Sequence, residues 1–477
     1  MACWPIIKLR EEAGSNATPV SLDNTLECAT AEAALASIRS LVGLPANALR
    51  VARTRSKKLV SRADNHMRLW RAIYARKRSG ATFVAVTGSS GKTTTTALIA
   101  HVLSGVAPVR SQVGTNVYRA HVRSLQSPPR NDCYFVSEAG SDGPGTLAPM
   151  LNVLRPTVGV VTLVALEHKS TFRSIDAVVE EKGKLVEVLP ANGLAVLNYD
   201  DPRVAAMAQR TKARSVTFGR RGGDYVISNL RCEVPGDLRL TITHAGKAFE
   251  IATAFTGAHY SVAVGAAFSC AHQLGVPPAV IVERIASFTP VFGRCSVHRV
   301  ENGPIFVNDA TKAPHHSLGL AFGLMAGFRA PRKRIVLGQI SDSSRSDKVY
   351  SQAYRAARSV VDQVIFVGEH SHRSKASAND VAAGRFAHFE KVADAADFLK
   401  QTAIPDELIL LKGAHNLHLE RLMLMFFTPV RCWIDVCGRK SHCILEGKQG
   451  CGLYGVPFDQ HKNARRDLAL LSDMNLG

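Results

Sequence analysis

A strand, a short glycine loop and a helix follow one another in residues 84–96, and this segment constrains the fold most. It reads Val84-Ala-Val-Thr-Gly-Ser-Ser-Gly-Lys-Thr-Thr-Thr-Thr96, with an apolar β-branched run before the glycines. Backbone N–H groups of such a loop and the positive end of the following helix point at one place. Because that place suits a polyphosphate, the segment predicts a phosphate-binding loop in preference to a glycine turn with a surface lysine.

The residue types in the loop fit this interpretation. Lys92 would reach the β and γ phosphates of a nucleotide, and the Thr93 hydroxyl would ligate Mg²⁺. Val86 stands where the longer G-x-x-x-x-G-K-[ST] consensus has its first glycine, so only the shorter G-x-x-G-K-T-T pattern is met. The predicted phosphate-binding residues are Gly88, Ser89, Ser90, Gly91, Lys92, Thr93 and Thr94.

The rest of the chain alternates strands with helices. From residue 81, short β-branched runs alternate with amphipathic runs, a pattern typical of a parallel sheet covered by helices. Residues 214–256 show strand after strand instead, which indicates an antiparallel insertion on the main sheet. A second alternating series begins near Pro304 and ends in a predicted helix over residues 415–427. The fold class is therefore α/β, with two sheet domains.

Composition excludes several classes of protein. Hydrophobic residues make up 46% of the 477 residues and charged residues 21%, and no apolar run approaches the roughly 18 residues of a membrane span. The N-terminus lacks the pattern of a secretory signal, so we expect a soluble, cytoplasmic protein. Lys and Arg number 59 against 39 Asp and Glu, a formal charge of +20 that favours anionic partners.

Half of this excess charge lies in one segment. Residues 50–78 hold 11 Lys or Arg and a single acid, Asp64. A solvated helix face is the preferred interpretation, and nucleic-acid or phosphate binding is the alternative. Since no aromatic platform or recognised nucleic-acid motif accompanies the charges, we expect no nucleic-acid partner.

Two more residues sit where ligands gather in α/β sheets, and Lys182 lies on the predicted helix that follows them. Glu138 ends the apolar run at 133–136, and His168 follows the predicted strand at 157–163. The carboxyl ends of parallel strands hold the ligand in such sheets. Glu138 is a candidate Mg²⁺ ligand. Taken alone, a histidine at the position of His168 is more often structural than a ligand, and a lysine in a charged helix, as Lys182 is, usually lies on a solvated face.

Four of the ten cysteines crowd the C-terminal tail. Four thiolates within twenty residues are compatible with a structural Zn²⁺ site, although none of the spacings is the compact C-x₂-C knuckle. Free or redox-active thiols are the alternative. The candidate zinc ligands are Cys432, Cys437, Cys443 and Cys451.

Taken together, residues 80–425 resemble the Mur ligase family, the ATP-dependent enzymes that build the peptide of peptidoglycan. Each motif is weak alone, and their order and spacing carry the resemblance. In chain order the motifs are GSSGKTTT at 88–95, SEAG at 137–140, RPTVGVVTLVALEH at 155–168, EKG at 181–183, GLAVLNYDDP at 193–202, TGAH at 256–259, FGR at 292–294, ND at 308–309, VLG at 336–338 and LKGAH at 411–415.

The resemblance implies a role for each matching residue. Glu138 and His168 would serve metal sites together with Thr93. Lys182 matches the family's lysine that is carbamylated, which would turn a cation into an anionic oxygen ligand for Mg²⁺. The catalytic residues implied are Lys92, His168 and Lys182. The remaining nucleotide-binding residues implied are His259, Arg294, Asp309 and Lys312.

The resemblance also implies the reaction and the domains. ATP would phosphorylate a carboxylic-acid substrate, and an amine or amino acid would displace phosphate to form an amide. The domains expected are a helical basic segment at 1–79, a P-loop-type parallel-sheet ATP-binding domain at 80–293, a smaller C-terminal, Rossmann-like α/β domain at 294–429 and the cysteine-containing tail at 430–477.

Three departures from the family pattern stand out. The Asn-bearing segment before the metal His reads Val161-Thr-Leu-Val164, so a polar side chain is missing. Tyr260 and Ala263 replace both amides of the family's adenine-binding stretch, and we expect Tyr260 to stack on the base instead. Where enzymes acting on UDP-linked precursors carry an α/β domain, about 79 mostly helical residues precede the ATP domain. These departures leave two functions open: a ligase for another acid, and a nucleotide-binding regulatory or assembly protein that has lost ligation.

Overall fold

A computed structural model gives the fold, and two units are distinguished in it. Residues 1–67 form one unit and residues 68–477 the other. The described residues are 64–114, 117–127, 131, 133–166, 171–341, 347–435, 453–457 and 460.

The first sheet has nine strands in the order β2-β3-β1-β4-β5-β6-β7-β8-β9. Strands β1 to β6 run parallel to their neighbours, and β7 to β9 form an antiparallel meander. The bounds are β1 Thr82–Thr87, β2 Val109–Gln112, β3 Tyr134–Glu138, β4 Val158–Val161, β5 Leu194–Asn198, β6 Arg214–Gly219, β7 Tyr225–Arg231, β8 Leu238–His244 and β9 Lys247–Thr253.

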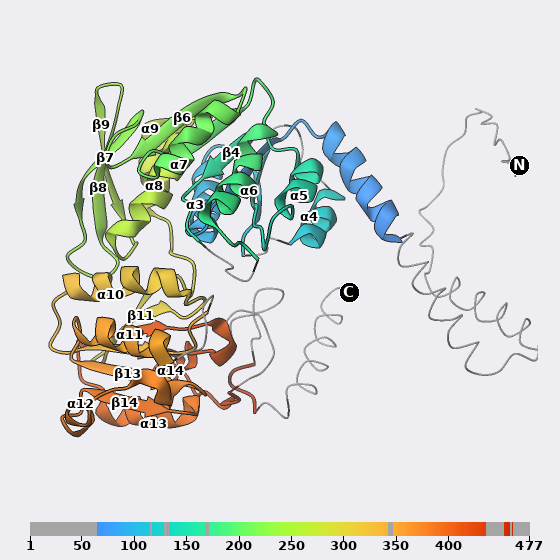
Figure 1. The fold of residues 1–477 in the computed structure, drawn as a ribbon. Helices are drawn as coiled ribbons and strands as arrows, with labels where there is room; N and C mark the ends of the chain where they lie inside the picture. The colour runs from blue at the N-terminus through green and yellow to red at the C-terminus, as the bar shows by residue number, and fades with distance from the viewer. Residues whose placement is uncertain are drawn as a thin grey trace, which may run out of the picture. The chain divides into compact units, whose positions relative to one another are not determined.

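Helices cover this sheet, as Figure 1 shows. Their bounds are α3 Lys92–Leu103, α4 Tyr118–Leu125, α5 Leu147–Leu154, α6 Ile175–Glu187, α7 Pro202–Ala205, η1 Ala206–Arg210, η2 Ala258–Tyr260, α8 Ser261–Gln273 and α9 Pro278–Ala286. The expected strand-rich region at 214–256 is confirmed, but its first strand is not antiparallel. Because α7 and η1 return the chain across the sheet, β6 runs parallel to β5.

The second sheet has six strands in the order β10-β11-β15-β12-β13-β14, all parallel except β10. Its strands are β10 Ser296–Arg299, β11 Ile305–Asp309, β12 Lys333–Leu337, β13 Gln363–Val367, β14 Phe386–Phe389 and β15 Leu408–Lys412. Its helices are η3 His315–Ser317, α10 Leu318–Gly327, α11 Asp347–Arg358, η4 Ser371–Ser374, α12 Ala378–Ala382, α13 Val392–Thr402, η5 His415–Leu417 and α14 Arg421–Leu424.

The single helix predicted over residues 415–427 is wrong. The segment forms η5 and the four-residue α14, separated by a break at His418. His418 adopts a left-handed backbone with φ 49°, and its Nδ1 lies 3.2 Å from Glu420 Oε1. An α-helix cannot continue through a residue with a left-handed backbone. The apolar residues of this segment therefore pack without forming one long helix.

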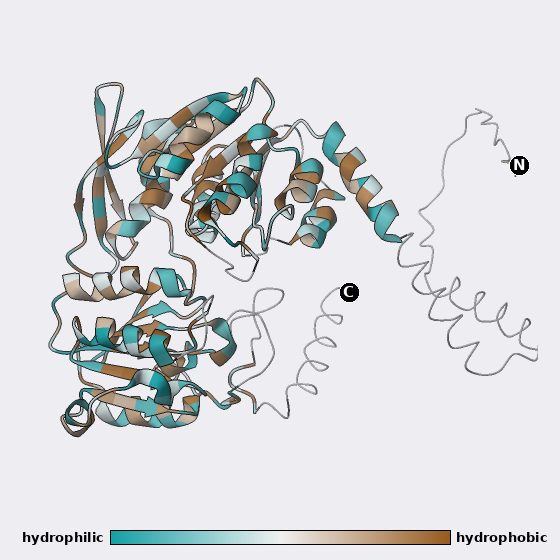
Figure 2. Cartoon of the chain, viewed as in Figure 1, coloured by the Kyte–Doolittle hydropathy of each residue, from teal (hydrophilic) through white to brown (hydrophobic). Residues whose placement is uncertain are grey.

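Burial follows the strands. Figure 2 shows hydrophobic residues along the central strands of both sheets, with mixed helices around them. Near-continuous apolar strands are expected where helices cover both faces of a parallel sheet. The α/β fold class with two sheet domains, predicted from the alternating pattern, is confirmed.

The helix at residues 64–78 packs on the first sheet domain through one face. Leu69, Ala72 and Ile73 join the apolar cluster of that domain. The Arg76 guanidinium is buried, donates to the carbonyl oxygens of Leu154 and Arg155, and lies 3.6 Å above the Phe83 ring. At least this arginine of the basic segment is therefore a structural residue, and not part of a solvated face.

Candidate functional site

The segment predicted to bind phosphate, residues 88–94, comprises the loop 88–91 between β1 and α3 and the first three residues of α3. Strand β1 lies between β3 and β4, the position at which the chain moves from one side of the sheet to the other. The helix begins at Lys92 with no acidic residue in its first turn, so no side chain there offsets its positive end. Lys92 Nζ donates to the Gly88 carbonyl oxygen at 2.5 Å.

Two glycines give the loop its shape. Gly88 has φ 142°, and a Cβ there would lie 2.0 Å from Thr162 Oγ1. Gly91 caps the helix with φ 81° and ψ −8°, a left-handed conformation that other residues rarely adopt. Both positions therefore require glycine, which explains the G-x-x-G spacing in the sequence.

The segment after β4 braces the loop. Ser89 Oγ donates to Ala165 O at 2.9 Å, and Ala165 N donates back to Ser89 Oγ at 3.0 Å. Thr162 Oγ1 donates to Ser90 O at 2.7 Å. The sequence comparison with the family suggests that this segment lacks a polar side chain. In the structure Thr162 supplies one, and it holds the loop.

A pocket brings the predicted residues of both sheet domains together. Of the predicted residues, those that line it are Ser89, Ser90, Gly91, Lys92, Thr93, Thr94, Glu138, His259, Arg294, Asp309 and Lys312. Gly88 is not in the lining and contributes the carbonyl oxygen that Lys92 binds. Ser89 and Lys312, 223 positions apart in sequence, thus share one cavity. Their individual roles remain predictions.

Lys412 is a pocket residue that the prediction missed. Its Nζ lies 2.5 Å from Asp309 Oδ2, and both side chains are nearly buried. Asp309 ends β11 and Lys412 ends β15, and the two are paired in register on these neighbouring parallel strands. The sequence contains a pattern that could have identified Lys412 as a pocket residue. Lys412 directly follows the apolar run 408–411, just as Glu138 stands at the end of its own strand.

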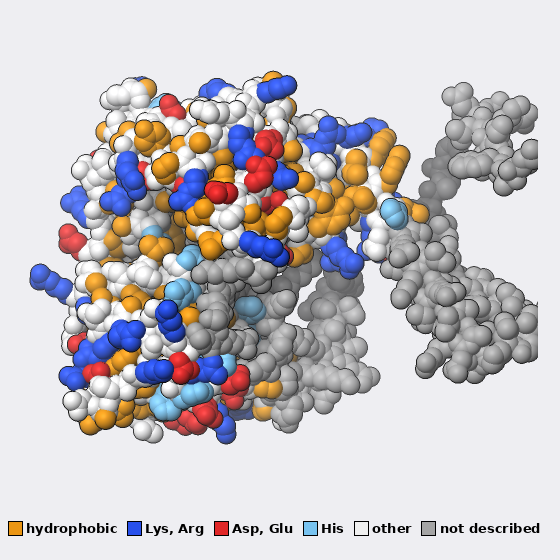
Figure 3. Space-filling model, viewed as in Figure 1, with side chains coloured by type: hydrophobic (Ala, Val, Ile, Leu, Met, Phe, Trp, Pro, Cys, Tyr) orange, Lys and Arg blue, Asp and Glu red, His pale blue; other side chains and the backbone are white. Residues whose placement is uncertain are grey.

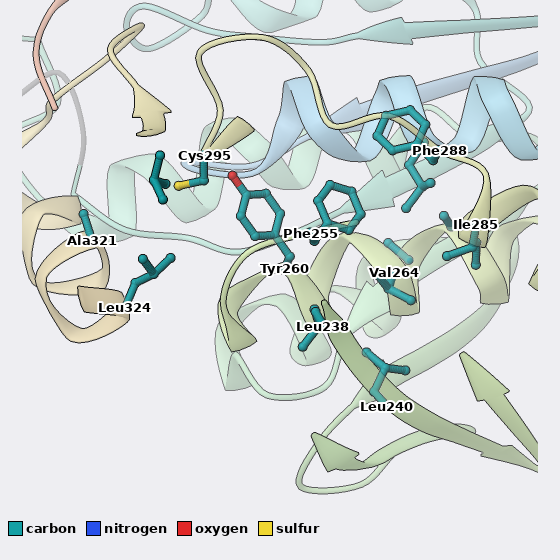
Figure 4. Packing of buried hydrophobic residues seen from close by; sticks show 14 of the residues in the cluster. Leu238, Leu240, Phe255, Tyr260, Val264, Ile285, Phe288, Cys295, Ala321 and Leu324 are labelled. Atoms are coloured by element: carbon teal, nitrogen blue, oxygen red, sulfur yellow. The ribbon is translucent and has the colours of Figure 1, made fainter. Parts of the chain in front are cut away.

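The other side of the pocket is formed around η2. Burial lowers the pKa of His259 to about 4. The charge of Asp309 raises this pKa, and the charge of Lys412 lowers it. The Tyr260 ring packs against Phe255, with ring centroids 4.7 Å apart, and its hydroxyl donates to Arg294 O at 2.7 Å. Figure 4 shows this hydroxyl beside Cys295. Tyr260 therefore braces the segment that carries Arg294, whereas its expected stacking on a base remains a prediction.

Of the predicted metal ligands, two lie in the pocket lining. Glu138 and Thr93 both line it, and Glu138 Oε1 accepts a hydrogen bond from Gly114 N at 2.5 Å. A carboxylate and a hydroxyl are oxygen donors that suit Mg²⁺. His168 lies outside the described residues. Within the described part of the chain, no three His, Cys, Asp or Glu side chains cluster as metal ligands.

Lys182 lies on α6 and is fully buried. Its Nζ donates to Ser141 Oγ at 2.9 Å, and Ser141 follows the SEAG motif that contains Glu138. The neighbouring Glu181 accepts hydrogen bonds from the N–H groups of Gly145 and Leu147, both at 2.7 Å. This carboxylate fixes the loop at the start of α5. Lys182 thus lies in an ordered, polar environment and is not a solvated lysine.

Two other predictions are only partly covered by the structure. Cys432 is buried, while Cys437, Cys443 and Cys451 lie outside the described residues, so the zinc site remains a prediction. In the basic segment, the described part carries an aromatic pair that the sequence analysis overlooked. Trp70 and Tyr74 are 71% and 50% exposed, and their rings stack at 5.9 Å.

Basic side chains are spread over the face of the molecule that Figure 3 shows. In Figure 3, the Lys and Arg residues of the visible described surface lie at several separate places. The basic residues at positions 50–62 fall outside the described residues. No helix in the described part of the chain is long and apolar enough to cross a bilayer.

Comparison with known proteins matches both sheet domains to one family. Residues 86–271 match the Mur ligase middle domain, and residues 293–415 match the Mur ligase glutamate ligase domain. The chain belongs to the Mur ligase family. The resemblance deduced from the ordered motifs is thereby confirmed.

Relatives of this Mur ligase family member include UDP-N-acetylmuramoyl-tripeptide–D-alanyl-D-alanine ligases. The Mycobacterium tuberculosis enzyme is 29% identical over 246 residues, 50% of this chain and 48% of the relative. The match thus spans about half the length of the first curated relatives. The Escherichia coli enzyme is 24% identical over 367 residues, 74% of this chain and 78% of that enzyme.

Solved structures share the fold. MurF from Acinetobacter baumannii aligns with a TM-score of 0.66 and 22% identity over 74% of this chain and 78% of that one. The MurF ligase from Thermotoga maritima, in complex with ADP, aligns with a TM-score of 0.66 and 21% identity over 75% of this chain and 82% of that one. At these identities the similarity is one of fold.

Proposed function

We propose that the protein is an ATP-dependent carboxylate–amine ligase that works through an acyl phosphate. The observation that carries this proposal is the single pocket in which the loop around Lys92 faces Arg294, Asp309 and Lys312 of the second sheet domain. Family membership and the similarity to ligases that join D-alanyl-D-alanine to a peptide precursor support the reaction class.

The first step needs two anions brought together. A substrate carboxylate oxygen attacks the γ phosphorus, the bond to the β–γ bridging oxygen breaks, and ADP leaves with that electron pair. Lys92, Arg294 and the N–H groups at the start of α3 neutralise the phosphate charge while they hold its geometry. Because phosphoryl transfer depends mainly on positioning and charge, the fixed geometry of the loop around Lys92 is the feature on which this step depends most.

Thr93 and Glu138 fit a magnesium ion, since both line the pocket and both offer oxygen atoms. Bound there, the ion would neutralise phosphate charge. Lys182 would add a further oxygen ligand as a carbamate, formed when its neutral amine combines with carbon dioxide and releases a proton. Its burial and its hydrogen bond to Ser141 are compatible with that modification.

The second step forms the amide. The amine nitrogen attacks the acyl carbon, inorganic phosphate leaves, and the nitrogen loses a proton. Since water would attack the same carbon, the pocket between the two sheet domains must exclude it. Asp309 and Lys412, almost buried at the pocket wall, are placed to keep this region ordered.

The test is a panel of acids and amines, with UDP-muramoyl peptides included, assayed for release of ADP. A ligase releases ADP only when both substrates are present. ADP release that needs no amine contradicts ligation, and nucleotide binding without turnover in any combination favours the regulatory alternative. The same panel identifies the substrate acid. The use of ATP suits a cytoplasmic reaction.

A further inference from the structure

Arg294 lies in a tight turn with an unusual backbone. Its N–H donates to the Val291 carbonyl oxygen at 3.0 Å, which closes the turn. On either side of Arg294, Gly293 and Cys295 adopt left-handed backbones, with φ 74° and φ 52°. Glycine tolerates this conformation, whereas a residue with a Cβ, such as cysteine, is strained in it. Such strain persists only where neighbouring groups hold the backbone in place.

Two hydroxyl groups hold this turn, one from each sheet domain. The Tyr260 hydroxyl donates to Arg294 O at 2.7 Å, and Thr311 Oγ1 donates to Gly293 O at 2.8 Å. Tyr260 ends η2 of the first sheet domain, whereas Arg294 directly precedes the strands of the second. Both Tyr260 and Arg294 line the pocket. The Tyr260 hydroxyl is therefore a bond between the two sheet domains at the pocket wall.

The Tyr260 ring is itself fixed, which fixes the position of its hydroxyl. Tyr260 is buried, and its ring lies at 6° to the plane of the Phe255 ring (Figure 4). Phe255 packs in turn against Phe288, with ring centroids 5.6 Å apart. Burial raises the pKa of Tyr260 well above its ordinary value of 10. The hydroxyl therefore keeps its proton at neutral pH and remains a donor to the strained turn.

The backbone of this turn decides where the Arg294 side chain lies. That side chain lines the pocket together with Lys92 and Lys312. A cation assists phosphoryl transfer only when it is held at the developing charge, and a displacement of about 1 Å costs up to about 100-fold in rate. Without the Tyr260 hydroxyl, Cys295 would be free to leave its left-handed conformation, and Arg294 would move with it.

We propose that Tyr260 is a positioning residue for ligation, and that its hydroxyl holds Arg294 at the phosphate end of the pocket by fixing the backbone of the turn. The proposal rests on the proposed function, since it assumes that Arg294 contacts the phosphates of ATP. It gives Tyr260 a task other than the base stacking expected from the sequence. Stacking needs only the ring, whereas positioning needs the hydroxyl.

Tyr260→Phe separates these two tasks, because it removes the hydroxyl and keeps the ring. The test is calorimetric binding of AMP-PNP, an ATP analogue with nitrogen between its β and γ phosphates, to the full chain with Mg²⁺ and without acid or amine. The dissociation constant should rise about fivefold in Tyr260→Phe, the effect expected for one lost hydrogen bond. Unchanged binding by a folded variant overturns the proposal.

Tyr225→Phe is the matched control. Tyr225 is also buried in the first sheet domain, its hydroxyl is hydrogen-bonded to His272 and Gln273, and it lies outside the pocket lining. Its variant should bind AMP-PNP as the unmodified protein does. Failure of AMP-PNP to bind the unmodified protein contradicts the proposed function itself, so the two failures are told apart before any variant is made.

A double-variant cycle with Arg294 distinguishes positioning from a general loss of structure. Arg294→Gln removes the cation, so adding Tyr260→Phe to it should change the affinity by less than about twofold. A general defect would weaken binding by the same factor with and without Arg294, and that result overturns the proposal.

Thr311→Val is a second variant, for the case in which Tyr260→Phe does not fold. It removes the other hydroxyl that holds the turn, the donor to Gly293 O. AMP-PNP binding should again weaken, and the effect should disappear in the presence of Arg294→Gln. If Thr311→Val folds and binds AMP-PNP with unchanged affinity, the turn does not set the position of Arg294 and the proposal is wrong.

Discussion

Asp309 Oδ2 and Lys412 Nζ lie 2.5 Å apart at the ends of two neighbouring parallel strands, and both residues line the pocket. The side chains retain only 12% and 5% of their exposure. A pair this buried differs from a surface ion pair, since removing one partner leaves the other charge without compensation in a poorly solvated place.

Lys412→Met should therefore lower the free energy of unfolding by about 3 kcal/mol, as expected when one partner of a buried ion pair is removed. The double variant with Asp309→Asn should regain part of that loss, because no charge is then left alone. Urea denaturation of the two single variants and the double variant measures the coupling. If the Lys412 and Asp309 effects simply add, the pair does not act as a unit.

Lys92→Ala should reduce the rate of amine-dependent ADP release about 100-fold or more, the usual effect of removing a preorganised group from the developing charge. The free energy of unfolding should change little, because Lys92 is only part-buried. The control is Lys247→Ala, an exposed lysine at the start of β9. Equal activity in the two variants would remove Lys92 from the mechanism.

Lys182→Ala should abolish ligation, and a short-chain carboxylic acid added in solution should restore part of it. The added acid would supply the anionic oxygens that the carbamate provides. Lys184→Ala, two residues along the same helix and not fully buried, is the matched control and should need no acid. A Lys182→Ala variant that folds, as judged by circular dichroism, but is rescued by no acid would argue against the carbamate.

Arg76→Ala should destabilise the protein by about 3 kcal/mol, because the Leu154 and Arg155 carbonyl oxygens each lose a charged donor. Arg78→Ala, on the exposed face of the same helix, should cost little, since Arg78 contacts only Tyr74 among the interactions described. Thermal unfolding of both variants measures the difference. Similar melting temperatures would mean that this helix does not stabilise the domain.

Much of the site was readable from the sequence because its residues follow recognisable local patterns. The loop at 88–94 sits between an apolar strand and a helix, and Glu138 ends a strand at the ligand-binding edge of the sheet. These positions depend on chain direction and periodicity, which a single sequence contains. The ordered motifs then added Arg294 and Asp309 from the second sheet domain.

What the sequence did not show depends on packing between distant segments. Nothing local indicates that Thr162 turns its hydroxyl to Ser90, or that Lys412 pairs with Asp309 across two strands. The helix predicted at 415–427 failed for the same reason, since the left-handed break at His418 lies within an apolar pattern. In the sequence Arg76 resembles the other basic residues near it, and only the structure shows the carbonyl oxygens to which it donates.

His259 provides a prediction for the dependence of stability on pH. Burial lowers its pKa in the folded protein to about 4, against an ordinary value of 6.5. Between these two values the unfolded chain carries a proton on His259 that the folded chain does not. The free energy of unfolding should thus fall as the pH is lowered from 6.5 to 4, by about 3 kcal/mol from this group.

His259→Gln should flatten this part of the pH profile, because glutamine does not titrate. His388→Gln, at an exposed histidine on β14, is the matched control and should keep the slope of the unmodified protein. Urea denaturation at intervals from pH 7.5 to pH 4 gives the three profiles. Apart from Asp309, which interacts with His259, the carboxylates contribute equally to all of them, so the difference between profiles reports mainly the histidine. Parallel profiles for His259→Gln and the unmodified protein would mean that this imidazole is not held neutral beside the pocket.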